Sequence, residues 1–349
     1  MGYILALCQY FRLNAYSGAG GLGSMAELAE VANTVETPKP LESLTGQELI
    51  RKHQIAKVST ETLRYLTDAF ASRGFDWLLP VVFSKSTDPL WPDPGASIEK
   101  RVEAEIYGQT VRTTLSMIIH KLVACSTAYP KLFIVSPNVR IERRERCATG
   151  WHAYEFTQFD FEVRDGDFKA VRGLVEDTLV GLIRHLNKKA KRELKSLRPN
   201  GGVKAPETPF KVYDRKALLE KYGEDWEERL RRHIQDPVWV TNIPREFYDF
   251  EDPITSTWDN YDLVVPKYGE ILSGAKREWE HGRILEKMER DGVEKNNFAL
   301  LLGLAKEGRL KPSAGAGIGI ERLVGWIVGT RHIGEVQPFP KVPGVVYEL

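Results

Sequence analysis

Val139-Arg140-Ile141-Glu142 and Glu155-Phe156-Thr157-Gln158-Phe159-Asp160 are the two segments that decide the fold of this chain. Side chains two positions apart on a strand share a face, so each segment predicts a strand with two different faces. In the second segment Phe159 and Phe161 belong to an apolar face that suits a core, whereas Phe156 shares its face with polar side chains. The alternation therefore predicts a strand pair with one buried face and one functional or solvated face.

The polar face of this strand pair has the side chains that a nucleotide needs. Arg140 can bind a phosphate, Phe156 can stack on a purine ring, and Glu142 can accept a hydrogen bond from the exocyclic amine. A solvated surface does not require an aromatic residue among polar ones. The pattern favours a nucleotide platform, and an amphipathic surface strand pair is the alternative.

Gly315-Ala316-Gly317-Ile318-Gly319-Ile320-Glu321-Arg322 predicts a glycine-rich strand that leads into a helix. Without Cβ atoms, a ligand or a neighbouring backbone can come close to the strand, and Arg322 at the helix start can meet a phosphate. Tight packing of the strand, with an ordinary surface arginine, is the alternative. The run matches neither the Gly-Lys-Ser/Thr phosphate loop nor the dinucleotide fingerprint, so those nucleotide folds are disfavoured.

Outward from these segments, the remaining pattern predicts hairpins and helices instead of repeated βαβ units. The predicted strands are 77–84 with a break at Pro80, a hairpin over 102–114, and 132–142, 154–163, 261–265, 269–272 and 314–320. The predicted helices are 59–74 with Ser59 as its cap, 117–126, 168–198, 277–291 and 321–328. We expect an α+β fold in which helices flank a mainly antiparallel sheet.

Composition narrows the class of protein. The chain has 349 residues, of which 42% are hydrophobic, and 49 Lys and Arg balance 48 Asp and Glu, so no overall basic field favours nucleic acid or anionic membrane. The three cysteines are scattered, and no export signal or membrane span is apparent, which fits a reducing cytoplasm. We expect residues 1–55 to form a partly flexible extension and residues 56–349 to form one catalytic domain.

Three motifs in this order resemble motifs 1, 2 and 3 of the class II aminoacyl-tRNA synthetases. They are Pro80 after a helix and strand, the segments 139–142 and 155–160, and the glycine-rich run that ends in Arg322. The resemblance covers roughly residues 55–349 and points to the aspartyl/asparaginyl subgroup. The runs 91–94, 243–248 and 311–317 resemble, more narrowly, the archaeal asparagine synthetases related to asparaginyl-tRNA synthetase, which make asparagine from aspartate, ammonia and ATP.

The resemblance implies roles in binding ATP and Mg²⁺. Arg140 would hold the α-phosphate, Phe156 and Arg322 would sandwich the adenine, and Arg140 and Arg322 would be catalytic. The implied ATP-binding residues are Arg140, Glu142, His152, Phe156, Glu270 and Arg322, and the implied metal ligands are Asp262 and Glu270. Trp151 stands where the relatives usually carry an arginine, for which Arg144 or Arg146 could substitute.

The resemblance also implies a site for aspartate. Its residues would be Asp88, Ser116, Lys121, Gln158, Asp160 and Arg277, with Arg277 as the fork that binds a carboxylate. Ile118 replaces a glutamine of the aspartyl relatives, and Asp88 replaces a glutamate that holds the substrate amine. Because asparagine carries its new amide on the β-carbon, we expect the α-carboxylate on Arg277 and Lys121 and the β-carboxylate beside the α-phosphate.

Residues 1–56 do not show the strand pattern of the anticodon-reading barrel that these relatives carry. The expectation is therefore an AMP-forming aspartate-ammonia ligase that works through a β-aspartyl-adenylate, with tRNA an unlikely partner. A paralogue that transfers an activated amino acid to tRNA or protein is the first alternative, and an inactive regulator that binds amino acid or nucleotide is the second. Motif 1 implies a homodimer.

Overall fold

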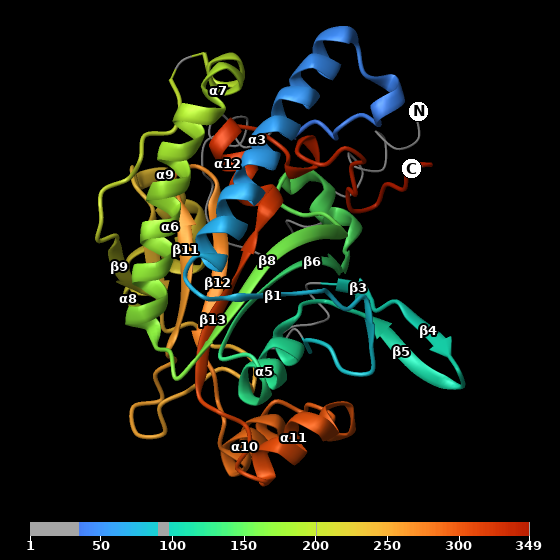
Figure 1. The fold of residues 1–349 in the computed structure, drawn as a ribbon, viewed down its shortest axis with the longest axis vertical. Helices are drawn as coiled ribbons and strands as arrows, with labels where there is room; N and C mark the ends of the chain where they lie inside the picture. Colours follow the sequence, from blue (N-terminus) through green and yellow to red (C-terminus); the bar gives the residue numbers. More distant parts are fainter. Residues whose placement is uncertain (1–34, 90–97, 200, 349) are drawn as a thin grey trace, which may run out of the picture. The chain divides into compact units, whose positions relative to one another are not determined.

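An eight-stranded sheet forms the centre of the computed structural model, which describes residues 35–89, 98–199 and 201–348 (Figure 1). Its strands, in spatial order, are β1 (Asp76–Leu78), β6 (Lys131–Val139), β8 (Glu155–Arg164), β13 (Ser313–Gly319), β12 (Gly269–Lys276), β11 (Asn260–Val265), β10 (Val238–Thr241) and β9 (Lys211–Asp214). The two outermost pairs, β1 with β6 and β9 with β10, are parallel, and all pairs between them are antiparallel. The predicted α+β fold with a mainly antiparallel sheet is confirmed.

Two small sheets extend from this centre. The first contains β2 (Phe83–Ser84), β5 (Gln109–Thr113) and β4 (Glu103–Ile106), and the second pairs β3 (Ile98–Lys100) with β7 (Ile141–Glu142). The predicted hairpin is confirmed, with its turn at Tyr107 and Gly108. The predicted strand 132–142 breaks at Arg140, which thereby lies between β6 and β7.

Helices cover both faces of the large sheet. They are α3 (Gly46–Ala71), α5 (Ile118–Thr127), α6 (Phe168–Lys189), α7 (Lys191–Leu197), α8 (Arg215–Tyr222), α9 (Trp226–His233), α10 (His281–Arg290), α11 (Ala299–Lys306) and α12 (Ile320–Val328). Short 3-10 turns lie at Leu41–Ser43, Arg144–Thr149, Gly223–Asp225, Lys295–Phe298 and Ile333–Glu335. None of the helices in the described residues is long and apolar enough to span a membrane.

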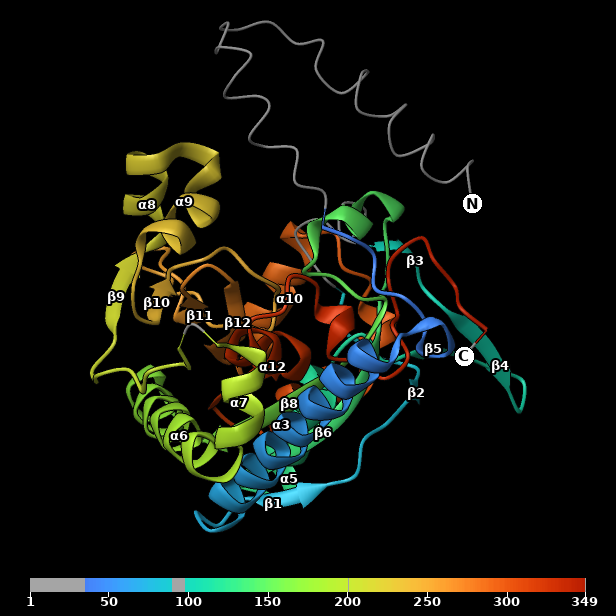
Figure 2. The same cartoon turned by 90° about the horizontal axis from the view of Figure 1, so that it is seen from above.

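The main core lies between the sheet and the group of α3, α6 and α12, and α3 and α6 lie side by side in Figure 2. The apolar face of β8 supplies Phe159 and Phe161 to this core, where both rings pack against Phe70 of α3. A second apolar cluster joins α5 to α10 and α11. Because α5 packs on the opposite side of β8, the polar face of that strand lies beneath α5.

The predicted start of the first helix is wrong. Thr45 caps α3 in a capping box with Glu48, and the helix passes through Ser59, whose hydroxyl donates to the carbonyl of Ile55. The boundary expected between residues 55 and 56 therefore falls within a helix. Ile55 is buried in the main core, so packing extends the helix beyond the segment whose sequence pattern is strong.

Other predicted elements differ in their bounds. The single helix predicted over 168–198 is two helices, because the chain leaves α6 and enters α7 at Ala190. The predicted strand 77–84 is divided between β1 and β2, on either side of Pro80. The helix predicted from Arg277 begins only at His281, so Arg277 follows β12 and forms an isolated bridge with Asp249.

Candidate functional site

One pocket opens over the polar face of the sheet and collects almost all of the predicted site residues. Of those residues, it is lined by Asp88, Ser116, Lys121, Arg140, Glu142, His152, Phe156, Gln158, Asp160, Glu270, Arg277 and Arg322. Asp262 is the predicted residue that does not line it. The strands β8, β12 and β13 form the floor of the pocket, and α5 and the segment 245–249 form part of its wall.

Phe156 and two arginines form one end of the pocket. The guanidinium carbon of Arg140 lies 5.2 Å from the centre of the Phe156 ring, while Arg140 Nε donates to the carbonyl of Leu115 at 2.9 Å. Arg322, from the first turn of α12, donates to the carbonyls of Trp151 at 3.3 Å and Glu270 at 3.1 Å. In this structure the cation over Phe156 is thus Arg140, and Arg322 lies near the Glu270 carboxylate at 3.6 Å.

His152 at this end is held as a neutral imidazole. Arg146 Nη1 donates to its Nε2 at 2.9 Å, so the ring proton is assigned to Nδ1, which lies 2.7 Å from the hydroxyl of Thr149. Burial, with Arg322, Arg146 and Arg140 nearby, lowers the pKa of His152 to about 3. Burial also raises the pKa of Glu142, although Arg146 lies 3.2 Å from its carboxylate. A neutral ring beside three arginines leaves their positive charge available for an anion.

His152 gives the fold a specific dependence on pH. The unfolded chain takes up a proton on this ring below pH 6.5 and the folded chain does so only near pH 3, so acidification favours the unfolded state. We expect His152→Gln to reduce the stability lost between pH 7 and pH 5 by at most about 2 kcal/mol. Urea unfolding at both pH values measures this difference. The same change at exposed His53 is the control, and an equal pH dependence in wild type and His152→Gln would contradict the prediction.

The glycine-rich strand β13 makes room for polar side chains of β8. A Cβ at Gly317 would collide with the amide of Gln158, and one at Gly315 would collide with the carboxylate of Glu162 and the backbone of Phe161. Gly317 also lines the pocket directly. Between the two interpretations of the glycine run, close packing accounts for Gly315, and Gly317 serves both packing and the pocket.

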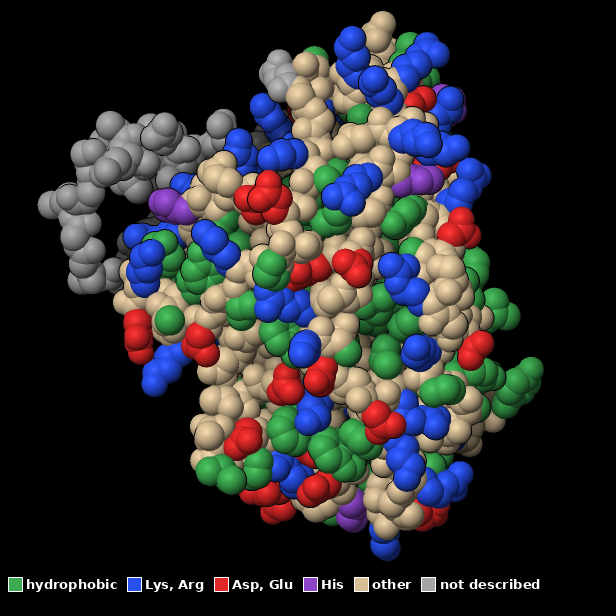
Figure 3. All heavy atoms as spheres, turned by 60° about the vertical axis from the view of Figure 1, so that its left-hand side comes forward, with side chains coloured by type: hydrophobic (Ala, Val, Ile, Leu, Met, Phe, Trp, Pro, Cys, Tyr) green, Lys and Arg blue, Asp and Glu red, His purple; other side chains and the backbone are tan. Residues whose placement is uncertain are grey.

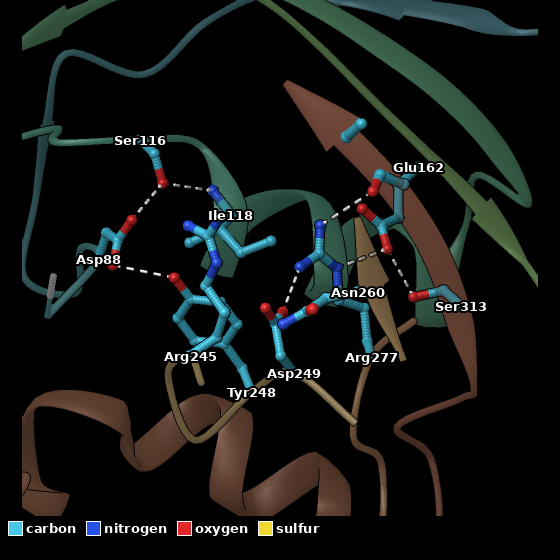
Figure 4. A network of polar contacts seen from close by, with 12 residues as sticks. Asp88, Ser116, Ile118, Glu162, Arg245, Tyr248, Asp249, Asn260, Arg277 and Ser313 are labelled. Carbon is cyan, nitrogen blue, oxygen red and sulfur yellow. Dashed lines mark hydrogen bonds and ion pairs between the residues drawn. The ribbon is translucent and has the colours of Figure 1, made fainter. Parts of the chain in front are cut away.

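Buried ion pairs form the other end of the pocket (Figure 4). Lys121 Nζ lies 3.0 Å from Asp160 and 3.5 Å from Glu162. Arg277 Nε donates to Glu162 at 3.2 Å, as Figure 4 shows. Arg277 Nη1 donates to Asp249 at 2.5 Å. All five side chains are buried, and the carboxylates raise the pKa of Arg277 despite its burial. Glu162 and Asp249 therefore hold the Arg277 guanidinium in one orientation.

Asp88 is the carboxylate that closes the pocket from the side of α5. The hydroxyl of Ser116 donates to Asp88 Oδ2 at 3.0 Å, and the hydroxyl of Tyr248 donates to Oδ1 at 2.9 Å (Figure 4). Ile118 places its backbone N–H 3.3 Å from Ser116 Oγ and its side chain in the pocket wall. The two departures from the relatives, Asp88 and Ile118, thus lie at one place in the pocket.

The predicted metal ligands, Asp262 and Glu270, lie on the adjacent strands β11 and β12, near enough for the Glu270 charge to add to burial in raising the pKa of Asp262, and each faces an arginine. Asp262 on β11 accepts from Arg245 Nη2 with both carboxylate oxygens, at 2.7 and 2.6 Å. Glu270 on β12 lines the pocket beside Arg322. No group of three or more His, Cys, Asp or Glu among the described residues could hold a metal ion. Glu270 fits a Mg²⁺ that shares the oxygens of a nucleotide, and Asp262 could join it only by exchanging its contact with Arg245 for the ion.

Several pocket residues were not assigned a role from the sequence. Arg245, Glu246, Tyr248 and Asp249 all lie in one segment between β10 and β11. The resemblance covers only the run 243–248, whereas the signal in the sequence itself is one Arg and two acids within 245–249, between two strands. Glu321 is a further such residue, and both its oxygens accept from the backbone N–H of Thr157 on β8.

Comparisons with known proteins agree with this fold. A family model described as tRNA synthetases class II (D, K and N) matches residues 51–343. An asparagine–tRNA ligase of Mycoplasma mobile is 28% identical over 250 residues, which are 63% of this chain and 55% of that protein. The chain thus spans about half the length of this curated relative.

Solved structures share the fold. Asparaginyl-tRNA synthetase from Pyrococcus horikoshii complexed with asparaginyl-adenylate gives a TM-score of 0.75 at 22% identity, over 85% of this chain and 70% of that one. Asparaginyl-tRNA synthetase of Entamoeba histolytica, also in complex with asparaginyl-adenylate, gives 0.71 at 20% identity, over 84% and 67%.

Proposed function

We infer that this chain, which belongs to the class II tRNA synthetases (D, K and N), is a ligase that uses ATP to activate an amino acid as its adenylate. The observation that carries this proposal is the pocket itself. One end has an aromatic ring with two arginines, which suits adenine and phosphates, and the other has buried Lys121 and Arg277, which suit a carboxylate. ATP–pyrophosphate exchange that depends on an amino acid tests it.

The residues would act mainly through position and charge. On ATP binding, Arg140 would move from Phe156 to the α-phosphate, and adenine would take its place on the ring. Arg322 would stabilise the charge that develops on the phosphates, and Glu142 and His152 would complete the nucleotide end. Arg322 is held by the backbone carbonyls of Glu270 and Trp151, so it is oriented before the reaction begins. Mg²⁺, where bound at Glu270, would supply further charge for the phosphates.

The amino acid would be aspartate or asparagine. Arg277 and Lys121 would face its carboxylate or amide, and Asp88 and Asp160 would accept from its ammonium group. Ser116 would orient Asp88, and Gln158 lies between the two ends of the pocket. Exchange assays with each amino acid distinguish the two substrates. Exchange with neither would overturn the proposal.

As the acceptor of the activated amino acid, tRNA is the first candidate. The relatives carry the names of tRNA ligases, and one surface of this chain is strongly basic despite the neutral total. Residues 184–204 contain eight Lys and Arg and a single acid, Glu193. Figure 3 views this side of the molecule, and Lys and Arg side chains gather over its upper part, where α7 lies. Such a surface suits the phosphates of RNA.

The basic surface provides a direct test of RNA binding. Lys191 and Lys195 are exposed one turn apart, and no ion pair engages either of them within the described part of the chain. We expect the double change Lys191→Glu, Lys195→Glu to weaken tRNA binding about tenfold. The slope of log affinity against log salt concentration should fall by about two, because two phosphate contacts are lost. Filter binding at several salt concentrations measures this. Lys295→Glu with Lys306→Glu, on the α10–α11 side, is the control, and equal affinities for both variants would remove the surface from the interaction.

Ammonia is the second candidate acceptor, and a feature of the pocket favours it. At the amino-acid end the acids Asp88, Asp160, Glu162 and Asp249 outnumber the cations Lys121, Arg245 and Arg277, and burial raises the pKa of Glu246 there well above its usual range. An excess of negative charge attracts a small cation such as ammonium, and attack of ammonia on a β-aspartyl-adenylate would give asparagine and AMP. Formation of asparagine from aspartate, ATP and ammonia without RNA would favour this candidate over tRNA, and aspartyl- or asparaginyl-tRNA formation would favour the first.

A homodimer is part of the proposal. Trp77, in the outermost strand β1, and Leu79, directly after that strand, are 58% and 86% exposed, which is unusual for such large apolar side chains. Sedimentation equilibrium measures the expected mass.

A further inference from the structure

Tyr248 and Asp249 are neighbours in sequence, and each contacts a different group of the pocket (Figure 4). The hydroxyl of Tyr248 donates to Asp88 at 2.9 Å, and the carboxylate of Asp249 accepts from Arg277 at 2.5 Å. Both side chains are buried, at 5% and 4% exposure. One dipeptide therefore joins the acid on the α5 side of the pocket to the guanidinium on the sheet side.

The backbone of this dipeptide is itself attached to the end of β12. Glu278 N donates to the carbonyl of Tyr248 at 2.8 Å, and Phe250 N donates to the carbonyl of Lys276 at 2.9 Å. These bonds place Asp249 opposite Arg277 in an antiparallel bridge. The position of the dipeptide relative to Arg277 is consequently set by a strand of the central sheet.

The other contact is equally constrained. Asp88 receives the Tyr248 hydroxyl on one carboxylate oxygen and the Ser116 hydroxyl on the other, so the plane of the carboxylate is defined. Burial and the nearby carboxylates raise the pKa of Tyr248 well above its usual range, which keeps the hydroxyl a donor. Tyr248→Phe would remove the hydroxyl donor at Oδ1 and retain the Ser116 hydroxyl at Oδ2.

We propose that Tyr248 and Asp249 are positioning residues. They fix the distance between Asp88, which accepts from the substrate's ammonium group, and Arg277, which donates to the substrate's carboxylate or amide. This inference rests on the proposed activation of aspartate or asparagine. An amino acid whose ammonium group and carboxylate or amide are separated by that distance contacts Asp88 and Arg277 at once, whereas a longer or shorter one does not. The dipeptide then determines which amino acid is activated, without contacting ATP.

The test separates the two ends of the substrate. Tyr248→Phe should raise the KM for the amino acid in pyrophosphate exchange roughly tenfold or more, because a buried hydrogen bond to a charged group is lost. The KM for ATP and the kcat should stay within about twofold. The inhibition constant of the analogue without the amine, succinate for aspartate or succinamate for asparagine, should not change. Asp249→Asn should weaken the binding of the amino acid and of the analogue to the same extent.

Tyr268→Phe is the matched control, because it removes a buried hydroxyl that contacts Thr330 and not Asp88. Wild-type exchange with an unchanged amino-acid KM in Tyr248→Phe would overturn this inference alone. An equal loss of affinity for substrate and analogue in Tyr248→Phe would also overturn it, since the effect would then be general to the pocket. A wild type that neither binds nor activates either amino acid would overturn the proposed function and this inference together.

Discussion

Arg322→Ala is expected to slow ATP–pyrophosphate exchange about a hundredfold to a thousandfold. The guanidinium would stabilise charge that develops on the phosphates, and loss of one such preorganised contact costs about 2.7 to 4 kcal/mol in the transition state. The fold should survive, because the side chain is partly exposed and its ion pair with Glu270 is long, at 3.6 Å. The measurement is exchange at saturating substrates, with circular dichroism to check the fold.

Arg331→Ala is the matched control for Arg322. Arg331 is exposed, lies in the chain after α12 and does not line the pocket. We expect its exchange rate to equal that of the wild type. If Arg322→Ala also retained exchange within a few-fold, Arg322 would not be part of the phosphate site.

Arg277→Met is the change with the largest expected effect on stability. It would leave the buried carboxylates of Glu162 and Asp249 without the cation that both contact. Breaking a buried pair in this way costs about 3 to 5 kcal/mol, because an uncompensated charge remains in the interior. We expect the free energy of unfolding to fall by about that amount, and amino-acid-dependent exchange to be lost. Urea unfolding followed by tryptophan fluorescence measures the first effect.

The loss in Arg277→Met should depend on pH in a defined direction. Burial already raises the pKa of Asp249, and Arg277 opposes that shift, so removing the arginine raises the pKa further. The folded variant then retains a proton that the unfolded chain releases, and its stability decreases as the pH rises above the ordinary Asp range.

The control for Arg277 is an arginine in an exposed ion pair. Arg309 contacts Glu307 at 3.0 Å with both side chains more than half exposed, so Arg309→Met should change the stability by less than about 1 kcal/mol. A similarly small loss in Arg277→Met would show that the buried acids do not depend on the guanidinium.

The sequence alone predicted the type of sheet and the two faces of β8. These properties are local: the side-chain period of a strand is two, so Phe159 and Phe161 had to share the face opposite Phe156 once the segment formed a strand. The glycine run and Arg322 were also recognisable, because a strand that leads into a helix is encoded by neighbouring residues. The expected start at Ser59 failed because packing at Ile55 extended the helix beyond its strongest pattern.

Only the tertiary structure decided which charged groups meet. The pairs Arg277–Glu162 and Tyr248–Asp88 join residues 115 and 160 positions apart, and the ion pair that withdraws Asp262 from the pocket depends on where the segment around Arg245 lies over β11. The basic run 184–204 is contiguous in the sequence and the balanced total charge does not reveal it, but only the folded chain decides that Lys191 and Lys195 are exposed. Strand register and the packing of loops on the sheet create these contacts, and neither is encoded in residues adjacent in sequence.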